Sequence, residues 1–299
     1  MRLSGAMTAL VTPFTPDDKF DERAARLILK QQLEGGIDGL VVGGTTGESP
    51  TITDEEKQRY TELALELSAG KVPIIVGTGS NNTKKTVEDT KIAKRWGATA
   101  ALVVCPYYNK PTQEGMFQHL KAVWEGAGLP IVAYNVPGRT ASDLLPETIA
   151  RLVEIGAIVA VKDATANMQR AIDTLALVDP KKPFSLLSGD DFTILPFIAC
   201  GGTGVISVVS NLAPSDTAAL VKASAKGDYA VARPLQTKLA ILSASLFQTP
   251  NPIPVKVGMS LLGLCSPAMR LPLVADEKVK NSMKQALFAY GGLLPAVWV

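Results

Sequence analysis

The sequence predicts an α/β fold of the (β/α)₈ or TIM-barrel type, with a helical appendage at its C-terminal end. Short apolar segments alternate with longer amphipathic segments, and this alternation repeats eight times. A chain of 299 residues with 46% hydrophobic and 19% charged side chains is long enough and apolar enough for one large core. The same composition excludes an intrinsically disordered chain.

The eight predicted strands are short apolar runs, as expected for parallel strands that are covered on both faces. They are residues 7–11, 39–42, 73–76, 100–104, 130–134, 158–162, 185–188 and 203–207.

A predicted helix follows each strand. The eight helices are residues 22–34, 54–68, 83–96, 113–127, 146–154, 167–177, 192–200 and 215–226. Capping chemistry supports the second helix, because Thr53 and the acidic residues 54–56 stand at its start. Glycines at 35–36 and at 97 are expected to end the first and third helices.

Residues 1–226 are predicted to form the catalytic barrel, and residues 227–299 the appendage with three further helical stretches. Residues 248–255 contain three prolines, so we expect a rigid connector that enters neither a central strand nor the interior of a helix. The uncharged residues 192–215 contain glycines and prolines, which predict a buried helix, turn and strand and not a membrane span.

The charge balance and the cysteines exclude several classes of protein. The 30 basic and 28 acidic residues give a net charge of +2, so no basic surface for nucleic acid or anionic membranes is expected. Residues 1–14 lack the apolar length of a signal peptide, and the three cysteines show no CxxC spacing. We therefore expect reduced thiols and a cytoplasmic location.

A metal centre is not expected. The sequence has a single histidine, His119, whereas catalytic sites of the histidine-rich type usually need two or three imidazoles. Four acidic residues near the predicted strand ends are interpreted as helix caps, with a hard cation as the alternative. They are Glu48, Asp163, Asp190 and Asp191.

Lys162 is the most unusual residue at the end of a predicted strand. Strand alternation places it on the same side as Ile158 and Ala160. If that side is the barrel interior, desolvation favours the neutral and nucleophilic amine. The alternative is a lysine that points to solvent beside Asp163.

Three tyrosines also lie near strand ends. Tyr134 ends the fifth predicted strand, where its phenol is suited to proton transfer, and a core tyrosine is the alternative. Tyr107 and Tyr108 are adjacent, so we expect them to diverge, one into a site and one toward a surface or interface.

Residues 43–49 offer two threonine hydroxyls and several backbone N–H groups to a small carboxylate. The alternative is a tight turn in which Ser49 is an N-cap. No lysine follows Gly47 as a phosphate-binding loop requires, and residues 77–79 lack the third glycine of a dinucleotide fingerprint.

Five motifs together resemble the dihydrodipicolinate synthase family in order and spacing. They are Gly44-Thr45-Thr46-Gly47-Glu48, the residues Tyr134 to Thr140, Val161-Lys162-Asp163, Ser188-Gly189-Asp190-Asp191 and the residues Asn251 to Lys256. The resemblance covers essentially the whole chain. It implies a lyase of the TIM-barrel type that condenses pyruvate with L-aspartate 4-semialdehyde on the route to diaminopimelate and lysine. It also implies a homotetramer built as a dimer of dimers, with no metal and no organic cofactor.

The resemblance implies the catalytic residues. Lys162 matches the lysine that forms a Schiff base with pyruvate. Tyr134 matches the tyrosine that relays protons with Thr45 and Tyr108. Tyr108 is expected to reach across the tight-dimer interface into the neighbouring site, and Tyr107 to line that interface.

The resemblance also implies the substrate-binding residues. Arg139 matches the arginine that holds the semialdehyde carboxylate, which suits a bidentate contact. Thr45 and Thr46 match the pocket for the pyruvate carboxylate, and Gly189 and Ile206 match backbone positions that line it.

Three alternatives stay open. The first is another pyruvate-dependent aldolase, such as N-acetylneuraminate lyase or a keto-sugar-acid aldolase, although Arg139 favours a short substrate with a terminal carboxylate. The second is a silent barrel that only binds pyruvate-like acids, and the third is a metal-dependent aldolase or hydrolase.

Lysine-sensitive relatives bind L-lysine at the dimer interface, and the corresponding region can be placed in this sequence. It comprises Ser49, Asp54, Lys57, Asn81, Lys85 and Tyr107. Asp54 and Lys57 stand where sensitive bacterial members carry histidines. Lys85 stands where they carry a glutamate that pairs with the ammonium group of the effector. We therefore expect weak or no inhibition by lysine, and an ordinary solvated helix face at Lys57 and Lys85 would give the same result.

Overall fold

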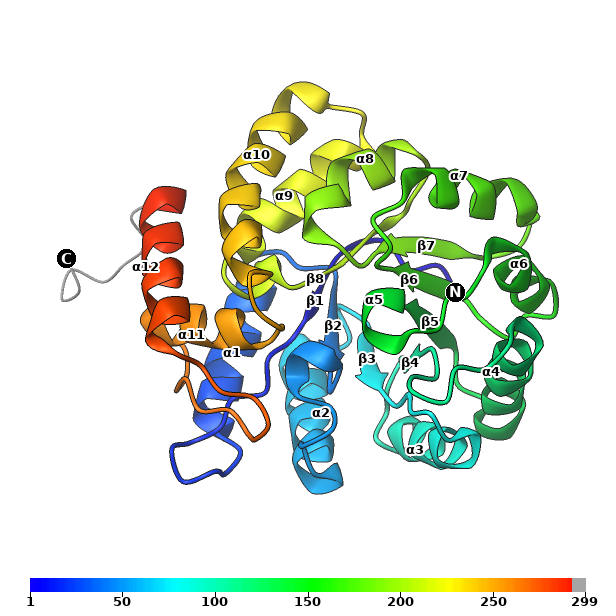
Figure 1. Ribbon diagram of the computed structural model, residues 1–299, viewed down its shortest axis with the longest axis horizontal. Helices are drawn as coiled ribbons and strands as arrows, with labels where there is room; N and C mark the ends of the chain where they lie inside the picture. Colours follow the sequence, from blue (N-terminus) through cyan, green and yellow to red (C-terminus); the bar gives the residue numbers. More distant parts are fainter. Residues whose placement is uncertain (292–299) are drawn as a thin grey trace.

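The computed structural model describes residues 1–291 and forms a closed barrel of eight parallel strands (Figure 1). Each strand pairs with its neighbours in the sequence, and β1 closes the ring by pairing with β8. The strands are β1 (Gly5–Ala9), β2 (Gly39–Val42), β3 (Ile74–Gly77), β4 (Ala100–Val104), β5 (Ile131–Asn135), β6 (Ala160–Asp163), β7 (Ser185–Ser188) and β8 (Gly204–Ser207). The predicted TIM barrel is confirmed.

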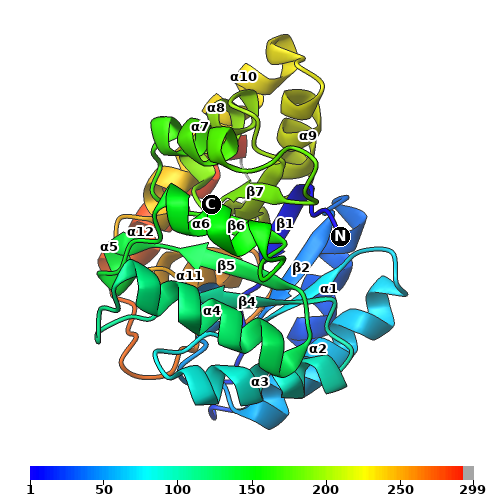
Figure 2. The same ribbon diagram turned by 90° about the vertical axis from the view of Figure 1, so that its right-hand side faces the viewer.

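Helices surround the strands in both views (Figures 1 and 2). They are α1 (Glu22–Glu34), α2 (Asp54–Ser68), α3 (Thr83–Arg95), α4 (Gln113–Ala127), α5 (Pro137–Thr140), α6 (Pro146–Glu154), α7 (Met168–Leu177), α8 (Ile194–Ala199) and α9 (Pro214–Ala225). Short 3₁₀ helices follow three of the strands: η1 (Thr45–Gly47), η2 (Asp191–Thr193) and η3 (Val209–Asn211). Sequence reasoning did not predict α5 or the 3₁₀ helices, because a single helical turn leaves no periodicity to detect.

The capping signals act as expected. Thr53 and Glu56 form a capping box at the start of α2: the Thr53 hydroxyl accepts the Glu56 N–H at 3.2 Å, and the Glu56 carboxylate accepts the Thr53 N–H at 2.9 Å. Gly97 follows α3 with a φ of 92°, a backbone conformation that favours glycine.

The barrel interior is a packed apolar core. Its buried side chains include Met7, Ala9, Val41, Ile75, Leu102, Val132, Ala160, Leu187 and Ile206. Gly39 makes room for Met7 on the neighbouring strand, since a Cβ atom at Gly39 would lie 2.9 Å from the Met7 Cγ. Ile158 was expected on the same side as Ala160 and Lys162, and this is wrong: β6 begins at Ala160, which faces the interior, whereas Ile158 packs in the outer layer between strands and helices.

Between residues 227 and 291, three helices follow the barrel: α10 (Tyr229–Leu246), α11 (Ile253–Leu261) and α12 (Glu277–Gly291). They lie together at one side of the barrel in Figure 1, and α10 packs against α9. α10 contacts η2 and η3, and α11 contacts η3, so the appendage reaches the carboxyl ends of β7 and β8. The proposed division at residue 226 stays a prediction, and residues 292–299 of the predicted appendage lie outside the described residues.

The predicted connector at 248–255 is too long. Residues 253–255 form the first turn of α11, with Pro254 among them. A proline is tolerated there because the first N–H groups of a helix have no partner within the helix. Within residues 1–291, no helix combines the length and the apolar character that crossing a membrane requires.

Candidate functional site

Lys162 lies at the carboxyl end of β6 with its side chain only 5% exposed. It is paired in register with Tyr134 on β5, and its Nζ atom lies 4.3 Å from the centre of the Tyr134 ring. Burial lowers the pKa of Lys162 to about 8, with Arg139 adding to this and Asp191 opposing it. The alternative of a solvent-exposed lysine is therefore wrong, and the side chain occupies the inner side of the barrel.

Tyr134 is equally buried, at the end of β5. Its burial raises the pKa of the phenol to about 12, while Arg139 and a hydrogen bond with the Thr45 side chain act in the opposite direction. The phenol therefore carries its proton at neutral pH and lies beside both a hydroxyl and an amine. This arrangement can pass protons between groups bound at Lys162.

The loop after β2 folds into η1, which begins at Thr45. Thr45 and Thr46 line a cavity of about 220 Å³ at the mouth of the barrel. The walls of this cavity also include Tyr134, Arg139, Lys162 and Gly189. Ser49 is not an N-cap, because Thr53 caps α2, so the tight-turn alternative is wrong in that respect.

Arg139 is placed by α5, the single turn that follows β5. Pro137 occupies the first turn of this helix, where its fixed φ favours helix formation. The exposed Arg139 guanidinium donates to the backbone oxygen of Asn251 at 3.3 Å. Asn251 therefore lies next to a predicted substrate-binding residue, although sequence reasoning assigned it no role.

Gly189 follows β7 and lies against the Lys162 side chain. A Cβ atom at Gly189 would approach the Lys162 Cε and Cγ atoms to 3.1 Å and the Ala164 Cβ to 2.9 Å. Any larger residue would thus crowd the Lys162 side chain. Ile206 lies in the packed barrel interior and not on the cavity wall, so its predicted backbone role stays a prediction.

The two adjacent tyrosines diverge, as predicted. Tyr107 lines a second cavity, whereas Tyr108 is 88% exposed in this chain and lines neither cavity. Tyr108 also has a φ of 69°, in the left-handed region that non-glycine residues rarely adopt. The chain alone does not bring Tyr108 to Lys162, and its role across an interface stays a prediction.

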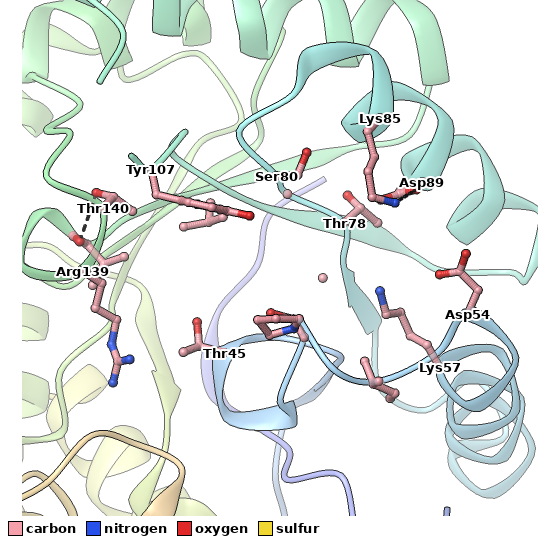
Figure 3. A pocket seen from close by; sticks show the side chains of 17 residues that line it. Thr45, Asp54, Lys57, Thr78, Ser80, Lys85, Asp89, Tyr107, Arg139 and Thr140 are labelled. Carbon is pink, nitrogen blue, oxygen red and sulfur yellow. Dashed lines mark hydrogen bonds and ion pairs between the residues drawn. The ribbon is translucent and has the colours of Figure 1, made fainter. Parts of the chain in front are cut away.

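The second cavity, of about 610 Å³, adjoins the first, since Thr45, Val136 and Arg139 line both (Figure 3). Of the predicted effector region, it contains Ser49, Asp54, Lys57, Lys85 and Tyr107. Asn81 is not on its wall, and the Asn81 backbone oxygen instead accepts from Asn109 at 3.0 Å.

The two lysines in this cavity differ. Lys57 is only 9% exposed, and its amine points into the cavity (Figure 3). Burial lowers its pKa, so the interpretation of Lys57 as part of a solvated helix face is wrong. The exposed Lys85 pairs with Asp89 at 2.9 Å, and this hydrogen bond raises its pKa.

The four acidic residues serve different purposes. Asp190 caps the start of η2, and Asp191 accepts the N–H groups of Val208 and Val209 at the start of η3. Neither Glu48 nor Asp163 caps the start of a helix, so the interpretation as a cap for a helix after a strand is wrong for both; Glu48 instead ends η1.

Each of these two carboxylates is held by a basic side chain. Asp163 forms an ion pair with Arg170 at 3.2 Å. Glu48 forms a fully buried ion pair with Lys256 at 2.6 Å. Sequence reasoning missed the second pair because nothing local to either residue indicates a partner so far along the chain. Residues 1–291 contain no cluster of three or more side chains suited to hold a metal ion.

Known proteins match this chain in sequence and in structure. Residues 2–289 match the model of the dihydrodipicolinate synthetase family. A 4-hydroxy-tetrahydrodipicolinate synthase from Anaeromyxobacter dehalogenans (strain 2CP-C) is 48% identical over 291 residues, which are 97% of this chain and 98% of the relative.

Two solved structures show the same similarity. A dihydrodipicolinate synthase from Thermotoga maritima has a TM-score of 0.95 at 41% identity, covering 98% of this chain and all of that one. A chloride-inhibited dihydrodipicolinate synthase from Acinetobacter baumannii, in complex with pyruvate, has a TM-score of 0.93 at 39% identity, covering 96% and 99%. The resemblance seen in the motifs is confirmed, and this chain belongs to the dihydrodipicolinate synthetase family.

Proposed function

We propose that this chain is a lyase that condenses pyruvate with L-aspartate 4-semialdehyde to 4-hydroxy-tetrahydrodipicolinate, in the biosynthesis of diaminopimelate and lysine. Relatives that match this chain over nearly their full length are named for this activity. The observation that carries the proposal is the buried amine of Lys162 beside the Tyr134 phenol, in a cavity that also presents Thr45, Thr46 and Arg139.

The first step joins pyruvate to Lys162. The neutral amine attacks the ketone carbon, and the ketone oxygen leaves as water when the imine forms. The lowered pKa of Lys162 supports this step because it increases the fraction of nucleophilic amine. We assign proton transfer in this step to Tyr134 and Thr45.

The second step makes the carbon–carbon bond. The imine draws electrons from the methyl group, which loses a proton and becomes an enamine. The enamine carbon bonds to the aldehyde carbon of the second substrate, and the aldehyde oxygen takes up a proton. The amine of that substrate then displaces Lys162 from the imine carbon, which closes the ring and frees the lysine.

The two substrate carboxylates have separate partners in this proposal. Thr45 and Thr46 receive the pyruvate carboxylate, since hydroxyl and N–H donors suit a small anion. Arg139 receives the semialdehyde carboxylate at the rim of the cavity, where its guanidinium is exposed. A polyhydroxylated sugar acid would gain less from a single guanidinium.

We also propose a homotetramer in the cytoplasm. Support for the assembly is the exposure of Tyr108, which lines neither of the two cavities, and of Tyr107 at the second cavity. Support for the location is the set of three unpaired cysteines. Light scattering after size exclusion measures the assembly, and a monomer at micromolar concentration would contradict it.

Borohydride reduction in the presence of pyruvate tests the mechanism. We expect one covalent adduct on Lys162 by peptide mapping, and nearly complete loss of turnover in Lys162→Ala. An adduct on another lysine, or none, would contradict the proposal. Turnover should be fastest with L-aspartate 4-semialdehyde, and faster turnover with a sugar-acid aldehyde would favour the related aldolases. Adduct formation without turnover on any aldehyde would favour a pyruvate-binding barrel.

A further inference from the structure

We infer that residues 251–256 of the appendage position the loop that receives the pyruvate carboxylate. Two buried contacts carry the inference: Asn251 with Thr46, and Lys256 with Glu48. The inference rests on the proposed function, because it gives the loop at Thr45 and Thr46 its role as the carboxylate pocket. Asn251, Glu48 and Lys256 are then positioning residues for the reaction.

The Glu48–Lys256 pair is closed to water. The Lys256 Nζ lies 2.6 Å from the Glu48 Oε1, and both side chains are 0% exposed. The other carboxylate oxygen, Oε2, accepts the backbone N–H of Arg270 at 3.0 Å. The Lys256 ammonium also lies 4.4 Å from the centre of the Phe14 ring. Each oxygen of Glu48 therefore has its own partner from the C-terminal part of the chain.

Stability alone does not account for such a pair. Burying two charges costs desolvation, and replacing a buried ion pair by well-packed apolar groups is often neutral or stabilising. What the pair does fix is the position of Glu48, which directly follows η1 and has a φ of 55°. A non-glycine residue rarely adopts this conformation, so the loop needs outside contacts to hold it. Lys256 and Arg270 supply those contacts.

Asn251 acts on the neighbouring hydroxyl. Its Nδ2 donates to the Thr46 Oγ1 at 2.9 Å, and both side chains are buried. Because the Thr46 oxygen accepts this bond, its own proton is left to donate elsewhere, and the adjoining space is the cavity beside Lys162. A carboxylate in that cavity is an acceptor only. The contact with Asn251 thus orients the Thr46 hydroxyl so that its proton can be donated to an anion in the cavity.

Two variants separate positioning from stability. Asn251→Ala removes the donor to Thr46 and leaves the ion pair. The double variant Glu48→Gln, Lys256→Met replaces the pair with neutral side chains of similar size, so no buried charge is left unpaired. Lys238→Met is the control, because it breaks an ion pair of similar length, 2.7 Å from Lys238 on α10 to Asp216 on α9, away from the loop at Thr46.

The measurement is borohydride trapping of the Lys162 imine at increasing pyruvate concentration, beside a thermal melt. We expect each of the two variants to raise the half-saturating pyruvate concentration about tenfold, the effect of roughly one hydrogen bond. The trapping rate at saturating pyruvate should stay close to that of the wild type. The control should leave half-saturation unchanged. In a Thr46→Val background, Asn251→Ala should add no further change, since its partner is already gone.

The outcomes are distinct. A lowered melting temperature with unchanged half-saturation in either folded variant would show a structural role and overturn the inference for that contact. If the double variant does not fold, Asn251→Ala and its Thr46→Val background decide the matter. Failure to trap wild-type protein on Lys162 would instead contradict the proposed function, so the two failures can be told apart.

Discussion

Lys162 owes its reactivity to its place at the end of β6. At neutral pH, the lowering of its pKa from 10.5 to about 8 increases the neutral fraction of the amine by roughly two orders of magnitude. Alternation along β6 correctly put Lys162 on the same side as Ala160, but whether that side is buried depends on Tyr134 and Gly189, which contact the lysine from neighbouring strand ends. Sequence reasoning from the residues alone therefore left two positions for this lysine open.

Arg139→Ala should damage the use of the second substrate. The loss of a charge-assisted contact to a carboxylate is worth about 1.5–3 kcal/mol, so kcat/KM for the semialdehyde should fall roughly 10–150-fold. Imine formation with pyruvate should survive. Arg139→Lys keeps the charge but loses the bidentate geometry, so it should recover only part of the loss. Equal loss of both steps would mean that Arg139 maintains the site as a whole.

L-Lysine should inhibit weakly or not at all. The buried amine of Lys57 points into the second cavity and repels a ligand ammonium group. Lys85 repels the same ammonium group less, because it already pairs with Asp89. Asp54 on the cavity wall attracts the ammonium group and offsets part of the repulsion from Lys57.

An activity titration with L-lysine checks this expectation. Half-inhibition should lie above about 1 mM, which corresponds to roughly −4 kcal/mol of binding. A Lys85→Glu variant should bind lysine more tightly than the wild type. Sub-millimolar inhibition of the wild type would show that the cavity accepts the effector in spite of Lys57.

Elements with clear periodicity and caps were predictable from the sequence. The predicted α1, α2, α4 and α6 agree with the structure in both bounds, because their apolar faces and capping residues are local signals. The single-turn helix α5 and the first turn of α11 have no such signal, although they place Arg139 and Lys256.

The site residues that sequence reasoning missed are those that reach the cavity through contacts between distant segments. Thr45, Thr46 and Lys162 were predicted because each directly follows or ends a strand, and parallel strands end on the same side of the barrel. Asn251 lies on no strand and reaches the cavity from the appendage. Its position depends on the packing of α10 and α11 over the barrel, which the sequence pattern does not encode locally.

Tyr290→Phe should loosen α12 while leaving the barrel intact. The buried Tyr290 hydroxyl donates to the Asp216 carboxylate on α9, and Asp216 also pairs with Lys238 on α10 at 2.7 Å. Removing the hydroxyl keeps the ring packing and should cost about 1–2 kcal/mol. Amide exchange should quicken in α12 and stay unchanged in the strands.

Lys280→Ala is the control for this experiment within the same helix. It removes a solvent-exposed pair with Glu277, so its effect should be near zero. Unchanged exchange in Tyr290→Phe, or equally faster exchange in Lys280→Ala, would contradict an anchoring role for the Tyr290 hydroxyl.

At the scale of the whole molecule, the ring of strands closes through contacts between the two ends of the barrel. β1 pairs with β8, and the Leu3 N–H donates to the Ser185 hydroxyl at 2.8 Å. A layer of helices surrounds this ring. The single histidine of the chain, His119, is buried in that layer on α4, and its ring contacts Thr83 on α3. We therefore expect protonation of His119 at low pH to reduce the stability of the whole fold.

His119 is buried, and its Nδ1 lies 3.0 Å from the Thr83 hydroxyl, while its Nε2 has no hydrogen-bond partner. Burial lowers its pKa from 6.5 to about 4, so between these values the unfolded chain binds more protons than the folded one. The stability that this difference provides is fully present above pH 6.5 and is lost as pH falls to about 4. It amounts to about 3 kcal/mol.

Urea unfolding between pH 4 and pH 7 measures this loss. The free energy of unfolding should fall with pH more steeply for the wild type than for His119→Leu, in which this group cannot titrate. Parallel curves for the two proteins would show that carboxylates alone determine the acid sensitivity.

The inferred positioning of Thr46 and Glu48 by residues 251–256 has a consequence during synthesis. The ribosome releases the N-terminal part of a chain first, so all eight strands emerge before Asn251 and Lys256 do. A nascent chain that ends at residue 246 carries every strand of the barrel, but it lacks the donor to Thr46 and the cation that faces Glu48. The carboxylate pocket is thus completed after the barrel that bears it. If the inference holds, we expect an unfinished chain that lacks residues 251–256 to bind pyruvate more weakly than the finished protein.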